Sequence, residues 1–383
     1  MISANKPLIA EPVLDQARQK LAREYSGIRR RLSLSESGLS LVLLLILIFT
    51  GVSRWFTTLF HLPSVATAVI FFLVLVIGYE VLTSPLSYYN GFVLPHRYGI
   101  STQKLRGWLA DLGKGGALSL VFGAAAVAVI YWLLLDFPTL WWLLAWGAML
   151  VVSILMSIIA PVFLVPLFYK VKPLEDLDLK SRLEQLAQKA GARIHGIFIL
   201  DFSAKVTSAN AALMGIGRTR RIVISDTLIQ QYPTQEIEVV TAHEIGHHMD
   251  RDLIRLFLFQ SAVFLAILKV ADWILNATVA PLGFNGLADP AALPWLILLF
   301  GALSLLLSPL TNSFTRSVER QADEYALTLT QNPESFIDSM TRLTNQNLAV
   351  AHPARWEEVL FYDHPSYNNR VAHARAFEKK WLK

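Results

Sequence analysis

The segment from Phe137 to Tyr169 contains no charged residue, which excludes an ordinary soluble structure for this part of the chain. About 20 apolar residues are enough for one helix to cross the hydrocarbon core of a bilayer, so this segment exceeds one crossing. A tilted helix, or a helix that projects beyond the bilayer, accommodates the extra length. Pro161 and Pro166 are expected to bend its end.

Five further segments are long and apolar, and each is expected to cross a membrane once: Leu39–Trp55, Ser64–Val81, Ala117–Leu135, Leu256–Leu275 and Trp295–Phe314. The composition agrees, because 54% of the residues are hydrophobic and only 16% are charged. Soluble domains carry about 25% charged residues. The sequence therefore predicts a mainly α-helical, polytopic membrane bundle of about six spans.

The polar segments divide the chain into four parts. Residues 1–168 contain an N-terminal amphipathic helix over residues 10–36 and four spans, with a polar loop from Pro85 to Gly116. Residues 169–255 form a polar segment between the fourth and fifth spans. Residues 256–314 contain two spans, and residues 315–383 form a polar, helical cytoplasmic segment.

Residues 169–255 have a mixed α+β pattern. Residues Leu174–Ala190 have apolar positions at helical spacing, whereas Gly196–Asp201 and Arg221–Ser225 are β-branched runs that predict short strands. Thr234 is expected to cap the following helix. That helix is expected to continue directly into the span that starts at Leu256.

The positive charges are distributed asymmetrically about the predicted spans. Of the 34 Lys and Arg residues, 32 lie on one side, and only Arg54 and Lys269 lie on or near the other. The positive-inside rule therefore places both termini and residues 169–255 in the cytoplasm. Glu80 is either functional or a solvated interfacial residue. Lys269 and Asp272 either pair on one helix face or lie at the far interface, which we favour.

Residues 241–248 contain the sequence His243-Glu244-Ile245-Gly246-His247, the H-E-x-x-H pattern of zinc metalloproteases. Two histidines four residues apart project from one face of a helix, where both rings can bind one zinc ion. Glu244 can then act as the base that activates a water molecule. The alternative is a surface helix that carries histidines by chance. Because the chain has no cysteine, any zinc site must use histidine and carboxylate ligands.

A catalytic zinc ion needs a third protein ligand, which must come from another part of the chain. The best candidate segment is Ser317–Tyr325, directly after the last span, where Glu319 and Asp323 share a helix face. From spacing alone, this segment is equally compatible with a charged surface helix.

Motifs along the whole chain resemble those of the integral-membrane zinc metalloproteases typified by the type I CAAX prenyl endopeptidase. They are Ser87-Tyr88-Tyr89-Asn90-Gly91-Phe92-Val93, Pro166-Leu167-Phe168 with Pro173-Leu174, Ser208-Ala209-Asn210-Ala211, Arg221-Ile222-Val223-Ile224 with Asp226-Thr227-Leu228, His243-Glu244-Ile245-Gly246-His247, Glu319-Arg320-Gln321-Ala322-Asp323, and His364-Pro365-Ser366 with Arg370. Several of these motifs are weak alone, but their order and spacing together are specific.

The resemblance implies that residues 169–255 form a small cytoplasmic, zincin-like catalytic segment. It also implies roles for eight residues and one Zn²⁺ ion per chain. Metal ligation is implied for His243, His247 and Glu319, general-base catalysis for Glu244, orientation of a ligand histidine for Asp323, oxyanion stabilisation for His364, support of that cluster for Arg370, and binding of the substrate backbone at a sheet edge for Asn210. In this family the spans enclose a water-filled chamber with the zinc site at its cytoplasmic end.

Two features differ from eukaryotic members of that family. Those members have seven spans, whereas this chain begins where their second span would, and residues 206–210 lack the histidine of their substrate strand. The short loops and the missing first span suggest a prokaryotic member in the inner membrane, for which turnover of membrane or misfolded proteins is a more natural task than cleavage of prenylated proteins. The net charge of +5 is modest, and no nucleic-acid partner is expected.

Two other functions remain as alternatives. One is a membrane quality-control metalloprotease of the heat-shock type, which four spans before the motif, rather than two, disfavour. The other is an inactive transporter or scaffold, although such a descendant would usually have lost Glu244 or one of the ligands. The sequence leaves the natural substrate and the oligomeric state open.

Overall fold

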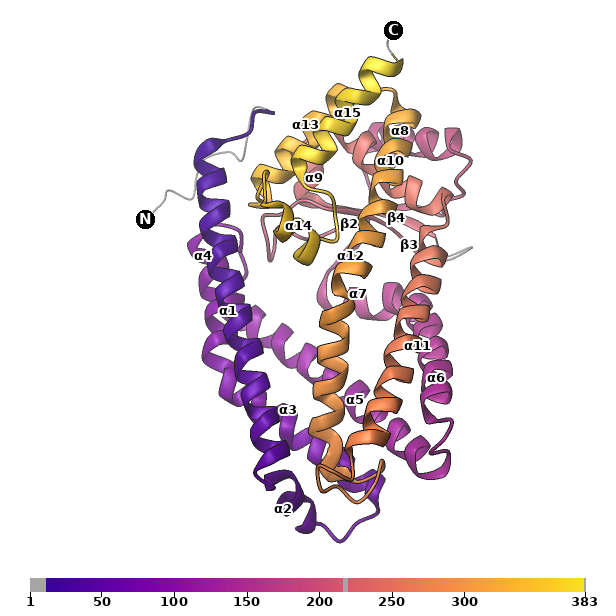
Figure 1. Cartoon of the computed structure of the whole chain (residues 1–383). Helices are drawn as coiled ribbons and strands as arrows, with labels where there is room; N and C mark the ends of the chain where they lie inside the picture. Colours follow the sequence, from indigo (N-terminus) through magenta and orange to yellow (C-terminus); the bar gives the residue numbers. More distant parts are fainter. Residues whose placement is uncertain (1–11, 216–219, 382–383) are drawn as a thin grey trace.

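The computed structural model describes residues 12–215 and 220–381 and has one long helical bundle with a small sheet at one end (Figure 1). Six helices are long and apolar enough to cross a membrane: Gln16–Phe49, Ser64–Arg97, Leu105–Asp136, Trp141–Phe168, Asp252–Thr278 and Pro290–Thr330. The prediction of a mainly α-helical protein with about six spans is confirmed.

The predicted N-terminal amphipathic helix and first span form one continuous helix, α1 (Gln16–Phe49), whose first turn is capped by the Asp15 side chain. The span ends at Phe49 and not at Trp55, because Gly51 adopts a left-handed conformation (φ 79°) that ends the helix. A separate short helix, α2 (Val52–Thr58), follows. Residues 10 and 11 of the predicted amphipathic helix lie outside the described residues.

The polar loop predicted over residues 85–116 is wrong, because most of this segment is helical. Helix α3 (Ser64–Tyr88) continues through a π-helical turn, η1 (Tyr89–Val93), into α4 (Leu94–Arg97), and α5 (Leu105–Asp136) begins soon afterwards. Polar side chains do not end a helix when its backbone hydrogen bonds remain intact. Only residues 98–104 form the connection between α4 and α5. Glu80 is exposed on α3.

The uncharged segment forms α6 (Trp141–Ile159), a π-helical turn, η2 (Ala160–Leu164), and α7 (Val165–Phe168). The π-helical turn contains Pro161, which cannot donate the usual backbone hydrogen bond. Pro161 and Pro166 were expected to bend the end of this helix. A π-helical turn is present at Pro161, but the helix continues through it.

The sheet has four strands in the order β1-β2-β4-β3, namely β1 (Val171–Pro173), β2 (Ile197–Leu200), β3 (Ala211–Met214) and β4 (Arg221–Ser225). Strands β2 and β4 were expected, whereas β1 and β3 carry too few β-branched residues to be recognised. Helix α8 (Leu177–Lys189) was also expected, and its apolar face packs with the sheet in one core.

Helices α9 (Asp226–Gln231) and α10 (Thr234–Met249) follow the sheet. Thr234 is the first residue of α10 and not its cap, which is Pro233. The helix also does not run straight into the membrane. Arg251 adopts a left-handed conformation (φ 55°), so the chain turns before α11 (Asp252–Thr278) begins.

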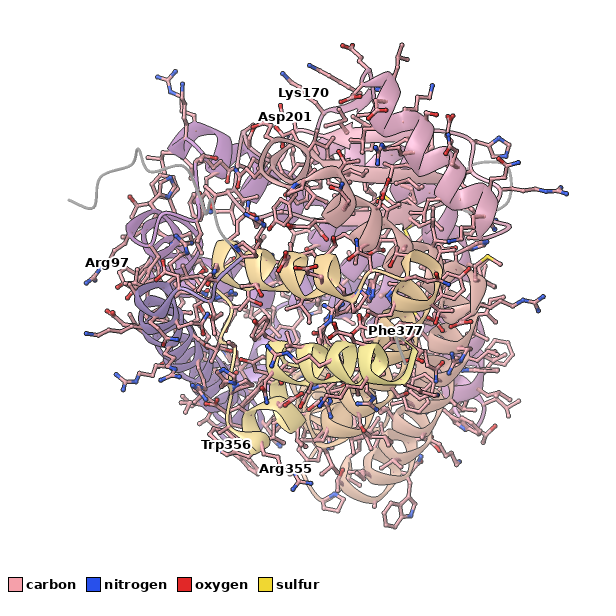
Figure 2. All side chains as sticks on the ribbon, turned by 90° about the horizontal axis from the view of Figure 1, so that it is seen from above. Arg97, Lys170, Asp201, Arg355, Trp356 and Phe377 are labelled. Atoms are coloured by element: carbon pink, nitrogen blue, oxygen red, sulfur yellow. The ribbon has the colours of Figure 1, made fainter. Side chains whose placement is uncertain are left out.

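A single 3₁₀ turn, η4 (Pro290–Ala292), precedes helix α12 (Leu293–Thr330). Helix α12 extends well beyond the predicted end of the last span. It is followed by α13 (Pro333–Gln346), α14 (Arg355–Phe361) and α15 (Tyr367–Trp381). Seen from above, α13 and α15 lie side by side, and Trp356 of α14 lies towards the edge of the molecule (Figure 2). The start of α1, the sheet and the end of α15 lie at the same end of the bundle (Figure 1).

Candidate metal centre

His243 and His247 project from α10 towards α12, where they meet Glu319. The three side chains offer ligand atoms that all lie within 4.8 Å of one another, and this is the one such group among the described residues. The two imidazole rings are nearly perpendicular, with centroids 4.7 Å apart. The candidate helix after the last span is therefore not an isolated surface helix, because its glutamate faces the H-E-x-x-H motif.

The carboxylate of Glu319 lies between the two rings. His243 Nε2 is 3.3 Å from Glu319 Oε2, and His247 Nε2 is 3.4 Å from Glu319 Oε1. Tetrahedral bonds of about 2.0–2.1 Å to one ion place any two ligand atoms about 3.3–3.4 Å apart. Glu319 is 6% exposed, and its Oε2 is buried without a hydrogen-bond partner of suitable geometry. The donor set, its spacing and the unpartnered oxygen all fit a zinc ion.

The outer nitrogen of each histidine faces a second carboxylate. His243 Nδ1 is 3.0 Å from Asp323 Oδ1, and Asp323 is only 1% exposed. Arg370 of α15 donates two hydrogen bonds to Asp323, one of them from Nε to Oδ2 at 2.9 Å. Its Nη2 also lies 3.5 Å from His243 Nδ1. The structure thus brings Asp323 and Arg370 together on one side of the centre.

His247 has an equivalent partner that the sequence reasoning missed. Its Nδ1 lies 2.9 Å from Oδ2 of Asp252, which is 1% exposed and accepts a second bond, also 2.9 Å, from Arg255. The turn at Arg251 brings Asp252 back towards His247. The sequence contains one signal for this contact, an acidic residue at the start of the next helix, but it cannot reveal the turn.

The charges around the motif shift its pKa values. Burial alone would lower the pKa of His243, but the neighbouring carboxylates of Asp323 and Glu319 outweigh it and raise that pKa to about 9. Burial raises the pKa of Glu244, although the neighbouring His243 and His247 limit the rise. A carboxylate with a raised pKa is better suited to exchange a proton near neutral pH.

His364 lies on the loop between α14 and α15. Its Nε2 is 3.3 Å from Glu319 Oε1, and its Nδ1 is 2.8 Å from Asp363 Oδ1. The hydrogen bond to Asp363 is the largest influence on the ring and raises the pKa of His364. The His364 side chain is 55% exposed, so it remains accessible beside the buried Glu319.

Asn210 lies directly before edge strand β3. Its main chain is fully engaged with β4, because its N–H donates to Ser225 Oγ and its carbonyl accepts from Ser225 N, both at 2.9 Å. Its exposed side chain is therefore the part that can reach a ligand.

Other polar residues near the motif lie outside the centre. Glu324, one residue after Asp323, forms an ion pair with His373 at 2.7 Å. His373 was expected to face solvent, and its side chain is 34% exposed. Burial and the nearby charge of Arg220 lower the pKa of His248.

Comparison with known proteins matches both parts of the chain. Residues 2–170 match the family described as CAAX prenyl protease N-terminal, five membrane helices, and residues 173–378 match peptidase family M48. Within the described part of the first range, four helices are long and apolar enough to span a membrane.

Several known sequences and solved structures are similar to this chain over most of their length. The uncharacterized metalloprotease YhfN of Bacillus subtilis is 30% identical, with 94% of this chain and 85% of that protein covered. CAAX prenyl protease 1 of Saccharomyces cerevisiae is also 30% identical, with 82% and 73% covered. The crystal structure of S. mikatae Ste24p matches with a TM-score of 0.83 and 26% identity, covering 97% of this chain and 92% of that one.

Proposed function

The chain belongs to peptidase family M48, and on that premise we propose that His243, His247 and Glu319 hold one Zn²⁺ ion used to hydrolyse peptide bonds. The family resemblance read from the motifs is confirmed, and the protein is an integral-membrane metalloendopeptidase. The observation that carries the zinc proposal is the buried carboxylate of Glu319, which lies 3.3 and 3.4 Å from two imidazole nitrogens.

When bound, zinc polarises the scissile carbonyl and lowers the pKa of water towards about 7. Glu244 accepts the proton of the attacking water and later delivers it to the leaving amine. Its partly buried position beside β3 keeps the carboxylate out of bulk water, which favours this exchange. Asp323 and Asp252 hold the two ligand rings in the orientation and tautomer that present Nε2 to the metal.

His364 stabilises the oxyanion that forms on the substrate carbonyl. The ring is exposed towards the approaching substrate and oriented by Asp363. A donor in this position typically contributes about 3–4 kcal/mol to stabilisation of the transition state. Arg370 acts through Asp323, which it holds with two hydrogen bonds.

The substrate binds as an added strand along β3, with its backbone also held by the Asn210 side chain. Strand β3 is at the edge of the sheet. It lies beside Glu244, because the main chain of Leu213 in this strand is hydrogen-bonded to the Glu244 carboxylate. Main-chain pairing at a free sheet edge binds extended peptides with little dependence on sequence. An extended segment of a protein is therefore the expected substrate.

The active site faces the cytoplasm of a prokaryotic cell, in its inner membrane. The 32-to-2 division of Lys and Arg residues supports this orientation. Six spans also return the chain to the same side, where the sheet and the end of α15 lie. Membrane or misfolded proteins are the proposed substrates, because a sheet edge can bind extended segments with little dependence on their sequence. Cleavage of prenylated proteins is the second candidate, which the names of the eukaryotic relatives favour.

Metal analysis and peptide cleavage test the core of the proposal. Purified protein should contain one zinc ion per chain, and a chelator should abolish cleavage that added zinc restores. Glu244→Gln should keep the zinc and the fold while abolishing cleavage, because it removes the base but no ligand. Zinc-free protein that still cleaves peptides, or undiminished cleavage by Glu244→Gln, would overturn the assignment.

A further inference from the structure

The segment 207–210, which leads into β3, is held on one side by the last residue of β4 and by α9. The carbonyl of Ser208 accepts a hydrogen bond from Thr227 Oγ1 at 2.7 Å, and the carbonyl of Asn210 accepts one from Ser225 N at 2.9 Å. The even-numbered residues of this segment therefore face the sheet.

The odd-numbered residues face the opposite side, where different partners satisfy them. Thr207 N donates to the carbonyl of Ile100 at 3.2 Å, and Gln346 Nε2 donates to the carbonyl of Thr207 at 2.6 Å. At Ala209, Asn347 Oδ1 accepts from the main-chain N–H at 3.1 Å, and Asn347 Nδ2 donates to the carbonyl at 3.4 Å. The side-chain amide of Asn347 thus occupies the position that a neighbouring strand would take at Ala209.

The same alternation continues into β3. In an antiparallel pair, successive residues face towards and away from the partner strand. Since Asn210 is bonded to β4, Ala211 and Leu213 face the free edge, and the main chain of Leu213 is hydrogen-bonded to Glu244. The open part of the edge therefore begins at Ala211, immediately after the residue that Asn347 covers.

We propose that Asn347 is a specificity-determining residue that ends the substrate-binding edge. A peptide added as a strand along β3 pairs from Ala211 onward and cannot extend its pairing to Ala209, so the number of residues recognised at one end of the substrate is limited. This inference rests on the proposed function, because it assumes that β3 binds the substrate.

Gln346 and Asn347, whose side-chain amides bond to Thr207 and Ala209, differ in their suitability as sites for a test mutation. Gln346 is 2% exposed and also accepts a hydrogen bond from the Tyr232 hydroxyl at 2.6 Å, so its replacement leaves buried polar groups unpaired and endangers folding. Asn347 is exposed at the end of α13, and Asn347→Ala is expected to fold normally.

The test uses two nested series of internally quenched peptides, each lengthened one residue at a time from one end of a peptide that the wild-type enzyme cleaves. For the wild type, KM should fall with length and then stop changing. For Asn347→Ala, KM in one series should continue to fall over about two further residues, the repeat of an antiparallel edge. One additional hydrogen-bonded pair should lower KM by about 3–10-fold. The kcat for the shortest peptide and the zinc content should not change.

Gln185→Ala is the matched control, because this amide is also exposed but lies on α8 and contacts its own helix instead of the sheet edge. Its Nε2 donates to Ser181 Oγ at 3.1 Å. It should change neither the thermal stability nor the length limit. The inference is overturned if Asn347→Ala keeps the wild-type limit, or if Gln185→Ala moves the limit equally. Absence of zinc-dependent cleavage by the wild type would instead overturn the proposed function, and the inference with it.

Discussion

The molecule buries carboxylates at both ends of its helical bundle, but it satisfies them differently. At the end opposite the sheet, Asp272 on α11 is 6% exposed and is surrounded by donors: Trp141 Nε1 at 2.8 Å, Lys269 Nζ at 3.1 Å and Asn276 Nδ2 at 3.1 Å. At the other end, Glu319 is equally buried but keeps one oxygen without a partner. A buried carboxylate whose oxygens all accept hydrogen bonds stabilises the fold. A buried carboxylate that lies between two imidazoles and has an oxygen without a hydrogen-bond donor can bind a cation.

The two expectations for Lys269 and Asp272 both apply. The residues form an ion pair on one helix face, and Asp272 contacts Trp141 at the start of α6, which places the pair near the far end of the bundle. The charges that interrupt the fifth span therefore connect two helices and need no catalytic explanation.

The largest predicted effect follows from the incomplete carboxylate. Glu319→Ala should empty the metal site and abolish cleavage, because it removes the third ligand. Zinc content by mass spectrometry and peptide cleavage measure the two losses. Asp272→Ala is the matched control and should keep stoichiometric zinc. If Glu319→Ala retained its zinc, the third ligand would lie elsewhere.

His364→Ala should reduce kcat by about 10²–10³-fold with unchanged zinc content, because it removes the oxyanion donor but no ligand. Steady-state kinetics with metal analysis of the same sample measures this effect. Replacement of the exposed His352, on the preceding loop, should leave kcat unaltered. Near-normal turnover by His364→Ala would reduce His364 to a surface residue.

Asp323→Ala should weaken zinc affinity by about 10–100-fold without removing a ligand, because His243 loses the partner that orients its ring. Competition with a chromogenic chelator gives the affinity. Glu324→Ala changes a neighbouring carboxylate that pairs with His373 and should have little effect. Equal losses in the two variants would contradict the assignment.

Zinc affinity should also depend on pH in a definite direction. Without metal, the pKa of His243 is raised to about 9, so the ring is protonated at neutral pH and must lose this proton when zinc binds. Apparent affinity should therefore fall by about tenfold for each unit of pH below about 9. Calorimetry in buffers of different ionisation enthalpy counts the released protons, and no proton release at pH 7 would exclude this coupling.

The smallest effect on catalysis is expected at the saturated carboxylate. Asp272→Ala should leave kcat and zinc content unchanged but lower the free energy of unfolding by about 1–3 kcal/mol, because the buried indole N–H of Trp141 loses its acceptor. Thermal unfolding in detergent measures the loss. A variant as stable as the wild type would show that the polar cluster contributes nothing to stability.

The sequence by itself determined the membrane spans and the chemistry of the motif. Hydrocarbon thickness sets the length of an apolar helix, and helical repeat sets the direction of His243 and His247, so both are local properties of the chain. The same local reasoning failed at residues 85–116, which are polar in composition but mostly helical in the structure. It also failed at β3, whose Ala-Ala-Leu-Met sequence lacks strand signals.

Only the tertiary structure decided which distant groups complete the site. Glu319 and Asp323 were candidates on a helix face, but their distances to the histidines depend on how α12 packs against α10. Asp252 reaches His247 because the backbone turns at Arg251, and Asn347 reaches Ala209 because α13 ends beside the sheet edge. Such contacts join residues far apart in the chain or depend on a single backbone angle, and neither apolar periodicity nor motif spacing contains that information.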